Sequence, residues 1–238
     1  MKTFKNSIGS YGLAVLAMAF TVLVFAACKK NNDFVNNNMP AAGVMAFNLS
    51  ADAPAVGFTF NGNGLSNAPI GYSNFTGVYL PVTPGSKEVR SVEFYSGSTI
   101  AISNNNFADS MYYSTFLLGA NGNYRNLVVK DEAKSLTPAT GKAWVRYINA
   151  IPDSSATPVV TIGGTVENAA YATISPFRQV NAGQLATSIS NGGSINANRT
   201  ITIEENRIYT ILMIGLPNTT DPAKAVQIRF VQNGTATD

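Results

Sequence analysis

The side chains that most often carry out chemistry in proteins are almost missing from this chain of 238 residues. It has no histidine, and its one cysteine is Cys28. After Cys28 the chain therefore cannot build Ser-His-Asp or Cys-His catalytic groups, zinc or haem sites on histidine or cysteine, or iron–sulfur clusters. An enzyme here would need a pair of carboxylates, as glycoside hydrolysis does.

Four acidic residues are the candidates for such a pair. Asp52 and Asp153 fall in turns at equivalent places in the two halves of the chain, and Glu204 and Glu205 are neighbours at the edge of an expected strand. Adjacent residues of a strand point to opposite faces, so Glu204 and Glu205 cannot face each other. The spacing typical of calcium loops is missing as well. We therefore predict no catalytic residue, no metal site and no cofactor, with a carboxylate-dependent glycan-acting enzyme as the alternative function.

Cys28 follows a segment typical of exported proteins. Lys2 and Lys5 precede an apolar run from Leu13 to Ala27, which ends in small residues. A positive end, a short apolar segment and small residues together predict an export signal. Phe25-Ala26-Ala27-Cys28 resembles the bacterial lipobox, in which the cysteine sulfur receives a diacylglyceryl group, although leucine is usual at the place of Phe25.

Two other interpretations of this segment stay open, an uncleaved membrane helix and a secretory signal cleaved elsewhere. The fifteen residues of the apolar run fall short of the roughly 20 that span a bilayer. We favour lipid attachment because Cys28 is the only cysteine. This interpretation predicts a signal peptide over 1–27 and a lipidated, flexible, asparagine-rich tether over 28–43. It places the protein at the bacterial outer membrane, facing the periplasm or the cell surface, with the membrane bound through the lipid on Cys28.

The charge balance argues against one class of partner. Lys and Arg number 16, and Asp and Glu number 13. A balance so close to zero on a sparsely charged chain provides no electrostatic footprint for a phosphate backbone. We therefore predict no nucleic-acid partner.

From residue 44 onward the sequence repeats itself once. Five markers recur in the same order at offsets of 96 to 101 residues. They pair Leu49-Ser50-Ala51 with Ile148-Asn149-Ala150, Tyr72 with Tyr171, Thr83-Pro84-Gly85 with Asn181-Ala182-Gly183, Thr99–Ile102 with Thr200–Ile203, and Tyr113–Gly119 with Tyr209–Gly215. The repeat predicts two copies of one module, over 44–131 and 143–238, joined by a linker over 132–142.

Each copy has the pattern of an all-β module. Short segments alternate apolar and polar residues, and the dipeptides Asn61-Gly62, Asn121-Gly122, Asn191-Gly192 and Asn233-Gly234 are typical of hairpin turns. The continuous apolar runs 116–118 and 211–214 predict central strands that are covered on both sides. We therefore expect two tandem Ig-like antiparallel β-sandwiches. The short linker between them favours a small interface with some hinge freedom.

The second copy resembles a family of bacterial envelope or secreted proteins, domain of unknown function 4397. The resemblance rests on the strand and turn Val145–Asp153, then Tyr171, Ser175-Pro176-Phe177 and Val180-Asn181-Ala182-Gly183. It implies tandem β-sandwich modules and carries no catalytic residue to this chain. Read physically, the matched residues are scaffolding. We expect Tyr72 and Tyr171 to bury their rings and bond their hydroxyls to backbone carbonyls, as a tyrosine corner does.

These observations favour a non-catalytic binding or structural module that holds a glycan or an envelope protein as its partner. Aromatic residues that could stack on sugar rings are Tyr79, Phe94, Tyr95, Tyr112 and Tyr113, although core packing explains most of them. Asp109-Ser110-Met111 resembles an O-glycosylation acceptor of some bacterial envelope proteins.

Overall fold

The computed structural model describes residues 39–153 and 155–236. The predicted signal peptide, the predicted lipid attachment residue Cys28 and the predicted tether as far as residue 38 lie outside the described residues. Within the described ranges, no helix is long and apolar enough to cross a membrane. From Pro40 onward the chain forms one compact unit.

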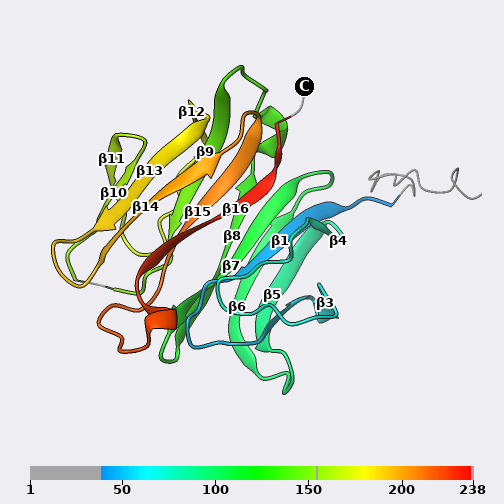
Figure 1. Ribbon diagram of the computed structural model, residues 1–238. Helices are drawn as coiled ribbons and strands as arrows, with labels where there is room; N and C mark the ends of the chain where they lie inside the picture. The colour runs from blue at the N-terminus through cyan, green and yellow to red at the C-terminus, as the bar shows by residue number, and fades with distance from the viewer. Residues whose placement is uncertain (1–38, 154, 237–238) are drawn as a thin grey trace, which may run out of the picture. The chain divides into compact units, whose positions relative to one another are not determined.

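The described residues form sixteen β-strands and two 3-10 helices (Figure 1). Their bounds are β1 Ala42–Asn48, β2 Val56–Phe60, β3 Asn63–Gly64, β4 Leu80–Val82, β5 Gly85–Glu93, β6 Thr99–Phe107, β7 Tyr112–Ala120, β8 Asn123–Asp131, η1 Ala133–Ser135, β9 Lys142–Asn149, β10 Val159–Ile162, β11 Thr165–Asn168, β12 Arg178–Asn181, β13 Gly183–Ser190, β14 Asn196–Ile203, β15 Arg207–Ile214, η2 Pro222–Lys224 and β16 Gln227–Thr235. We call the part with β1–β8 module 1 and the part with β9–β16 module 2.

Each module is a sandwich of two four-stranded sheets. The strand orders are β4-β1-β7-β8 and β3-β2-β5-β6 in module 1, and β12-β9-β15-β16 and β11-β10-β13-β14 in module 2. We call the sheets with β1 or β9 the inner sheets and the other two the outer sheets. Strand pairs are antiparallel except β1 with β7 and β9 with β15, which are parallel. The predicted all-β fold with two tandem sandwich modules is confirmed.

Backbone angles show the repeat directly. Gly119 and Gly215 have φ of 114° and 118°, at the predicted offset of 96 residues. A Cβ atom at these positions would lie 2.0 Å from Asn123 O and 2.4 Å from Ala225 O, so only glycine fits. Gly85 and Gly183 likewise have φ of 102° and 109°.

Two of the five sequence matches are wrong in register. Asn149 corresponds to Asn48 rather than to Ser50, because both asparagines end the first inner strand and accept from the backbone N–H two residues later. Phe107 pairs with Gly85 as Ile203 pairs with Gly183, so β6 and β14 align at an offset of 96, not 101. The loops between these strands differ in length, and short apolar patterns can be matched at more than one register.

The predicted Asn-Gly turns have two outcomes that the structure explains. Asn61-Gly62 and Asn121-Gly122 have positive φ at both residues and close hairpins, as predicted. The prediction for Asn233-Gly234 is wrong, because these residues lie inside β16. There the register with β15 shifts by one residue, so the dipeptide marks a β-bulge rather than a turn.

Each module has its own apolar core between its two sheets. Module 1 packs Val44, Phe58, Val89 and Leu117 in this core, and module 2 packs a corresponding set that includes Ile162. Because side chains alternate along a strand, the opposite faces of β1, β7, β9 and β15 must be covered by something else.

The two inner sheets cover each other. Phe47 and Phe116 of module 1 form one buried cluster with Ile148 and Leu212 of module 2. The rings of Phe47 and Phe116 stack with their centroids 4.7 Å apart. This confirms that the apolar runs are central strands covered on both sides. The expected small interface is wrong, because the cover of each inner sheet is the other module.

Candidate functional site

One end of the unit gathers the connections that leave the inner strands. Since β1 and β7 are parallel, the connection 49–55 after β1 and the turn 121–122 after β7 lie at the same end of module 1. In module 2 the connections after β9 and β15 correspond to them. We call this the loop end.

An open groove of about 1030 Å³ lies at the loop end. Its lining consists of Ala120, Asn121, Asn123, Pro152, Asp153, Ser155, Thr157, Pro158, Ala170, Tyr171, Ser194, Leu216, Pro217, Asn218 and Thr219. Both modules contribute, module 1 through its β7–β8 turn and module 2 through four separate segments. Figure 1 shows the long connection between β15 and β16, with η2, at the same end as the β7–β8 turn.

The groove lies where the two copies of the module differ. β7 and β8 are joined by the two residues 121–122, whereas β15 and β16 are joined by 215–226, which includes η2. The connection after β9 is also longer than the one after β1. The longer connections of module 2 supply most of the groove. Loops that vary on a constant scaffold are the usual place for binding residues.

Asp153 lies in the groove wall with its carboxylate held in place. Oδ1 accepts from Ser155 N at 2.8 Å, and Oδ2 accepts from the hydroxyls of Ser155 and Ser194 at 2.8 and 3.1 Å. The bonds from Ser155, with the one from Ser194, hold the pKa of Asp153 below its usual value. The carboxylate is therefore ionised at neutral pH and fixed in orientation, while Oδ1, which accepts one hydrogen bond, keeps a lone pair for a ligand.

Asp52, its counterpart in module 1, has a structural role. Oδ2 accepts from Asn121 N at 2.6 Å and from the Tyr124 hydroxyl at 3.0 Å, and Oδ1 accepts from the Ser50 hydroxyl. Burial alone would raise the pKa of Asp52, but these hydrogen bonds outweigh it and the pKa is lowered. The carboxylate thus anchors the β7–β8 turn, whose Asn121 lines the groove.

Three amide side chains at the groove have no hydrogen-bond partner in the described part of the chain. Asn121 and Asn123 come from module 1, and Asn218 comes from module 2. All three residues are exposed. Each amide both donates and accepts, so the groove presents unused polar groups from two sides.

Tyr171 lies in the groove lining, whereas Tyr72 does not. The hydroxyls of both are buried without a hydrogen-bond partner among the described residues. Burial raises the pKa of both, for Tyr72 to about 12. The prediction that these two hydroxyls bond to the backbone is therefore wrong. The guanidinium of Arg125 covers the Tyr171 ring, 5.2 Å from its centroid.

Two other tyrosines bond to the backbone, but as acceptors and not as the donors to carbonyls that were expected of Tyr72 and Tyr171. The hydroxyls of Tyr113 and Tyr209 accept from the backbone N–H of Ala108 and Glu204, five residues earlier in each case. Tyr113 and Tyr209 are also matched by the repeat, each near the start of an inner strand. This matched position was the sequence signal that could have identified them.

The other predicted candidates are spread over the unit. Tyr113 is a core residue, and Tyr79 and Tyr112 pack on each other. Phe94 and Tyr95 form an edge-to-face pair at the turn after β5, where Tyr95 is 79% exposed. None of these five aromatic side chains lines the groove.

The remaining polar candidates lie at exposed turns. Glu204 and Glu205 follow β14, and Glu204 forms an ion pair with Arg207. Ser110, the predicted acceptor of a sugar, is exposed with φ of 59° between β6 and β7. Asp109 beside it accepts from Ala41 N, which joins the start of β1 to this turn.

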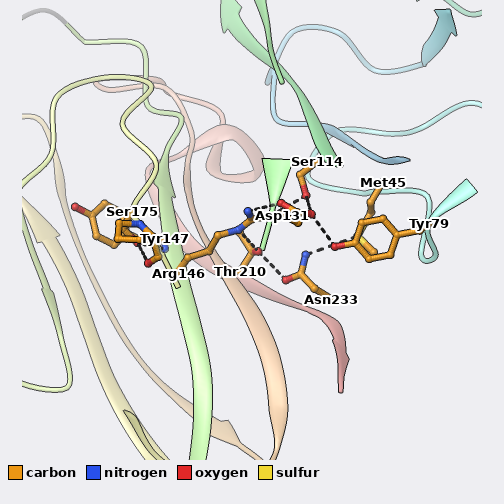
Figure 2. A network of polar contacts seen from close by, with 10 residues as sticks. Met45, Tyr79, Ser114, Asp131, Arg146, Tyr147, Ser175, Thr210 and Asn233 are labelled. Carbon is orange, nitrogen blue, oxygen red and sulfur yellow. Dashed lines mark hydrogen bonds and ion pairs between the residues drawn. The ribbon is translucent and has the colours of Figure 1, made fainter. Parts of the chain in front are cut away.

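A buried polar network between the modules has no counterpart in the predictions (Figure 2). Arg146 of β9 pairs with Asp131 of β8 at 2.5 Å, and the two side chains are 2% and 0% exposed. Arg146 also donates to the hydroxyls of Ser114 and Thr210 at 2.8 and 3.0 Å. The signal for it was an arginine inside a strand that is otherwise apolar on both faces.

The network is fully paired around the charges. The hydroxyls of Tyr79 and Ser114 both donate to Asp131 Oδ2 at 2.7 Å. Burial, with the neighbouring Asp131 charge, raises the pKa of Tyr79, so it stays protonated and donates. The guanidinium of Arg146 also lies 4.4 Å from the centroid of the Phe177 ring. These groups are closed off from the groove and join the modules.

The family is decided by the sequence match along both modules. The family profile described as "Domain of unknown function (DUF4397)" matches residues 42–160 and 143–237. The chain belongs to this family. The first DUF4397 match covers β1–β8 and extends into β10, where it overlaps the second match over module 2, so two DUF4397 modules in tandem account for the described fold.

Comparison with other proteins adds little about the activity of DUF4397 modules. No curated protein matches the chain. One solved structure, described as a "putative cell adhesion protein" from Bacteroides eggerthii, is similar to it at 12% sequence identity and a TM-score of 0.22. The similarity covers 83% of this chain and 96% of that one. At this TM-score it supports no argument about fold or function.

Proposed function

We propose that this chain is a lipid-anchored, non-catalytic binding protein of the bacterial cell envelope, and that the groove holds its partner, a glycan or a protein. The observation that carries the proposal is the groove itself. It is assembled from both modules, and module 2 supplies most of it through connections that are longer than those of module 1. A repeated scaffold whose connections differ in length around a groove is typical of a binding protein.

The place where the chain enters the unit supports this proposal. The chain enters at Ala42, the start of β1, and the groove lies beyond the other end of that strand. Seven residues at about 3.3 Å each separate the two by roughly 20 Å. The groove therefore lies at the end of module 1 opposite to the point where the chain enters.

The carboxylates argue against the alternative of a glycan-acting enzyme. Such an enzyme needs an acid and a second carboxylate on either side of the scissile bond. In the described part of the chain, Asp153 is the one acid in the groove lining. The carboxylate oxygens of Asp52 accept hydrogen bonds from Asn121, Tyr124 and Ser50. Hence the groove offers a fixed acceptor but no acid–base pair.

Photocrosslinking in intact cells tests the proposal. A photoreactive residue replaces Thr157, which is exposed in the groove lining, in the full chain. Asn104 on β6, exposed and outside the lining, carries the same residue in the control. We expect one species, identified by mass spectrometry, to be captured repeatedly from position 157 and not from position 104. No capture, or the same capture from both positions, would contradict the proposal.

A further inference from the structure

The charges of the groove restrict the class of ligand. Among the described lining residues, Asp153 is the one charged side chain, and there is neither lysine nor arginine. A phosphate, sulfate or uronate group would meet an ionised carboxylate and no cation from the described lining residues themselves, so anionic ligands are disfavoured. Arg125 is close by, but its guanidinium lies over the Tyr171 ring.

The neutral polar groups fit a ligand rich in hydroxyls. The amides of Asn121, Asn123 and Asn218 have no partner in the described ranges, and each can donate to one hydroxyl while it accepts from another. Thr157 adds a hydroxyl that is also without a partner there. Asp153, held by Ser155 and Ser194, adds a stronger acceptor whose position is fixed before binding.

The apolar part of the lining is made mostly of small side chains. Among the described residues it consists of alanines, prolines, Leu216 and the ring of Tyr171, with no cluster of large apolar side chains such as a peptide anchor would need. The walls are mainly turns and connections, so they offer little strand edge for an added peptide strand. A volume of about 1030 Å³ is at the upper end of ligand sites, roughly 300 to 1,000 Å³, and holds a short oligosaccharide.

We infer that the groove binds an uncharged oligosaccharide, with Asn123 and Asn218 contacting its hydroxyls from opposite modules and Asp153 as the fixed acceptor. The inference rests on the proposed function and narrows it from a glycan or a protein to one class of ligand. Since the groove is open, an internal segment of a longer polysaccharide can lie in it as well as a free oligosaccharide.

The test measures binding of defined oligosaccharides to the full chain, purified in detergent and held on a sensor surface. One set of probes contains uncharged oligomers of glucose, mannose, xylose and N-acetylglucosamine. The second set contains oligogalacturonate and sulfated oligosaccharides. We expect binding from the uncharged set only.

Three variants locate the binding. Asn123→Ala removes one amide at the start of β8, and Asn218→Gly removes another at a residue whose φ of 59° glycine adopts freely. Each should weaken binding about five- to tenfold, as the loss of one or two hydrogen bonds does. Asn104→Ala, an equally exposed asparagine on β6, is the matched control and should bind like the unchanged chain. Thermal unfolding of all three should coincide.

The outcomes separate this inference from the proposed function. If no uncharged oligosaccharide binds, or the groove variants bind as tightly as the control, the inference is overturned. Should position 157 capture a protein in cells while the oligosaccharides fail, the binding groove stands and its ligand is a polypeptide. Preferred binding of the acidic probes would overturn the inference too, since it contradicts the charge argument.

Discussion

Asp52 and Asp153 show how one residue type at one repeated place can serve two purposes. Both carboxylates fix a turn through hydrogen bonds, and both have a lowered pKa. Asp52 spends its oxygens inside module 1, on the turn that carries Asn121. Asp153 faces the groove, where the longer connections of module 2 leave room for a ligand. The difference between them lies in their surroundings rather than in their own geometry.

The hydrogen bonds to Asp52 predict a pH dependence of stability. Its pKa is lower in the folded chain than the ordinary value of 3.8, so the stabilisation is present above about pH 4 and is lost as the pH falls through the folded pKa. We expect Asp52→Asn to lower the free energy of unfolding near pH 7 by less than about 1 kcal/mol, because solvent screens this partly exposed group. The decline in stability between pH 5 and pH 3 should become shallower in the same variant.

Denaturant unfolding at several pH values measures this effect. Glu205→Gln is the control, since Glu205 is exposed and has no side-chain hydrogen bond in the described part of the chain. Parallel pH profiles for the unchanged chain and Asp52→Asn would show that the carboxylate does not hold the turn.

At the scale of residues, the sequence predicted correctly that a tyrosine bonds to the backbone in each module, but it selected the wrong tyrosines. A tyrosine bonded to the backbone does occur once per module, but at Tyr113 and Tyr209. Both pairs of tyrosines recur at a fixed offset, so the offset alone could not choose between them. Which tyrosine bonds to the backbone depends on which hydroxyl lies beside a free backbone N–H, and the packing of the folded chain determines this.

At the scale of elements, the inner strands β1, β7, β9 and β15 carry the architecture. Their continuous apolar character predicted cover on both sides, and the structure confirms it. The sequence could not predict that the other module covers the second face of these strands, because the apolar pattern of a strand does not specify which surface packs on it. The groove could not be predicted for a similar reason, since loop lengths do not say which loops from two modules meet.

The contact between the inner sheets has two related halves. Arg146 of module 2 corresponds to Met45 of module 1, because they pair with the matched residues Thr210 and Ser114. Arg146 contacts Asp131, whereas Met45 contacts Asn233, whose amide lies 3.8 Å from its sulfur. One half of the interface is therefore ionic and the other half is neutral.

This relation predicts a non-additive pair of substitutions. Arg146→Met alone leaves the Asp131 carboxylate buried without its cation and should cost about 3–5 kcal/mol of unfolding free energy. Arg146→Met combined with Asp131→Asn copies the neutral half and should recover most of that loss. A double-mutant cycle by denaturant unfolding gives the coupling energy. A loss in the double variant equal to the sum of the Arg146→Met and Asp131→Asn losses would show that the charges do not act as a pair.

At the scale of the whole molecule, the predicted lipid on Cys28 decides where the groove can act. Intact mass spectrometry of the protein purified from membranes should give the mass of residues 28–238 plus a diacylglyceryl group, with or without a further acyl chain. Cys28→Ser should lose this modification because the hydroxyl does not replace the thiol. A mass that includes residues 1–27, or a mature chain that begins elsewhere without lipid, would favour one of the two other interpretations of the apolar segment.

The ionic and neutral halves of the interface also make the two modules non-interchangeable. Two copies of module 2 meeting in the same way would bring Arg146 against Asn233, and two copies of module 1 would bring Asp131 against Met45. Each mismatch buries a charge without its counterion, which is strongly unfavourable. Although the two modules share one sequence pattern, each therefore pairs more favourably with the other module than with a second copy of itself. The charge pattern of the interface thus favours closure of the two inner sheets within one chain over pairing between like modules of two chains.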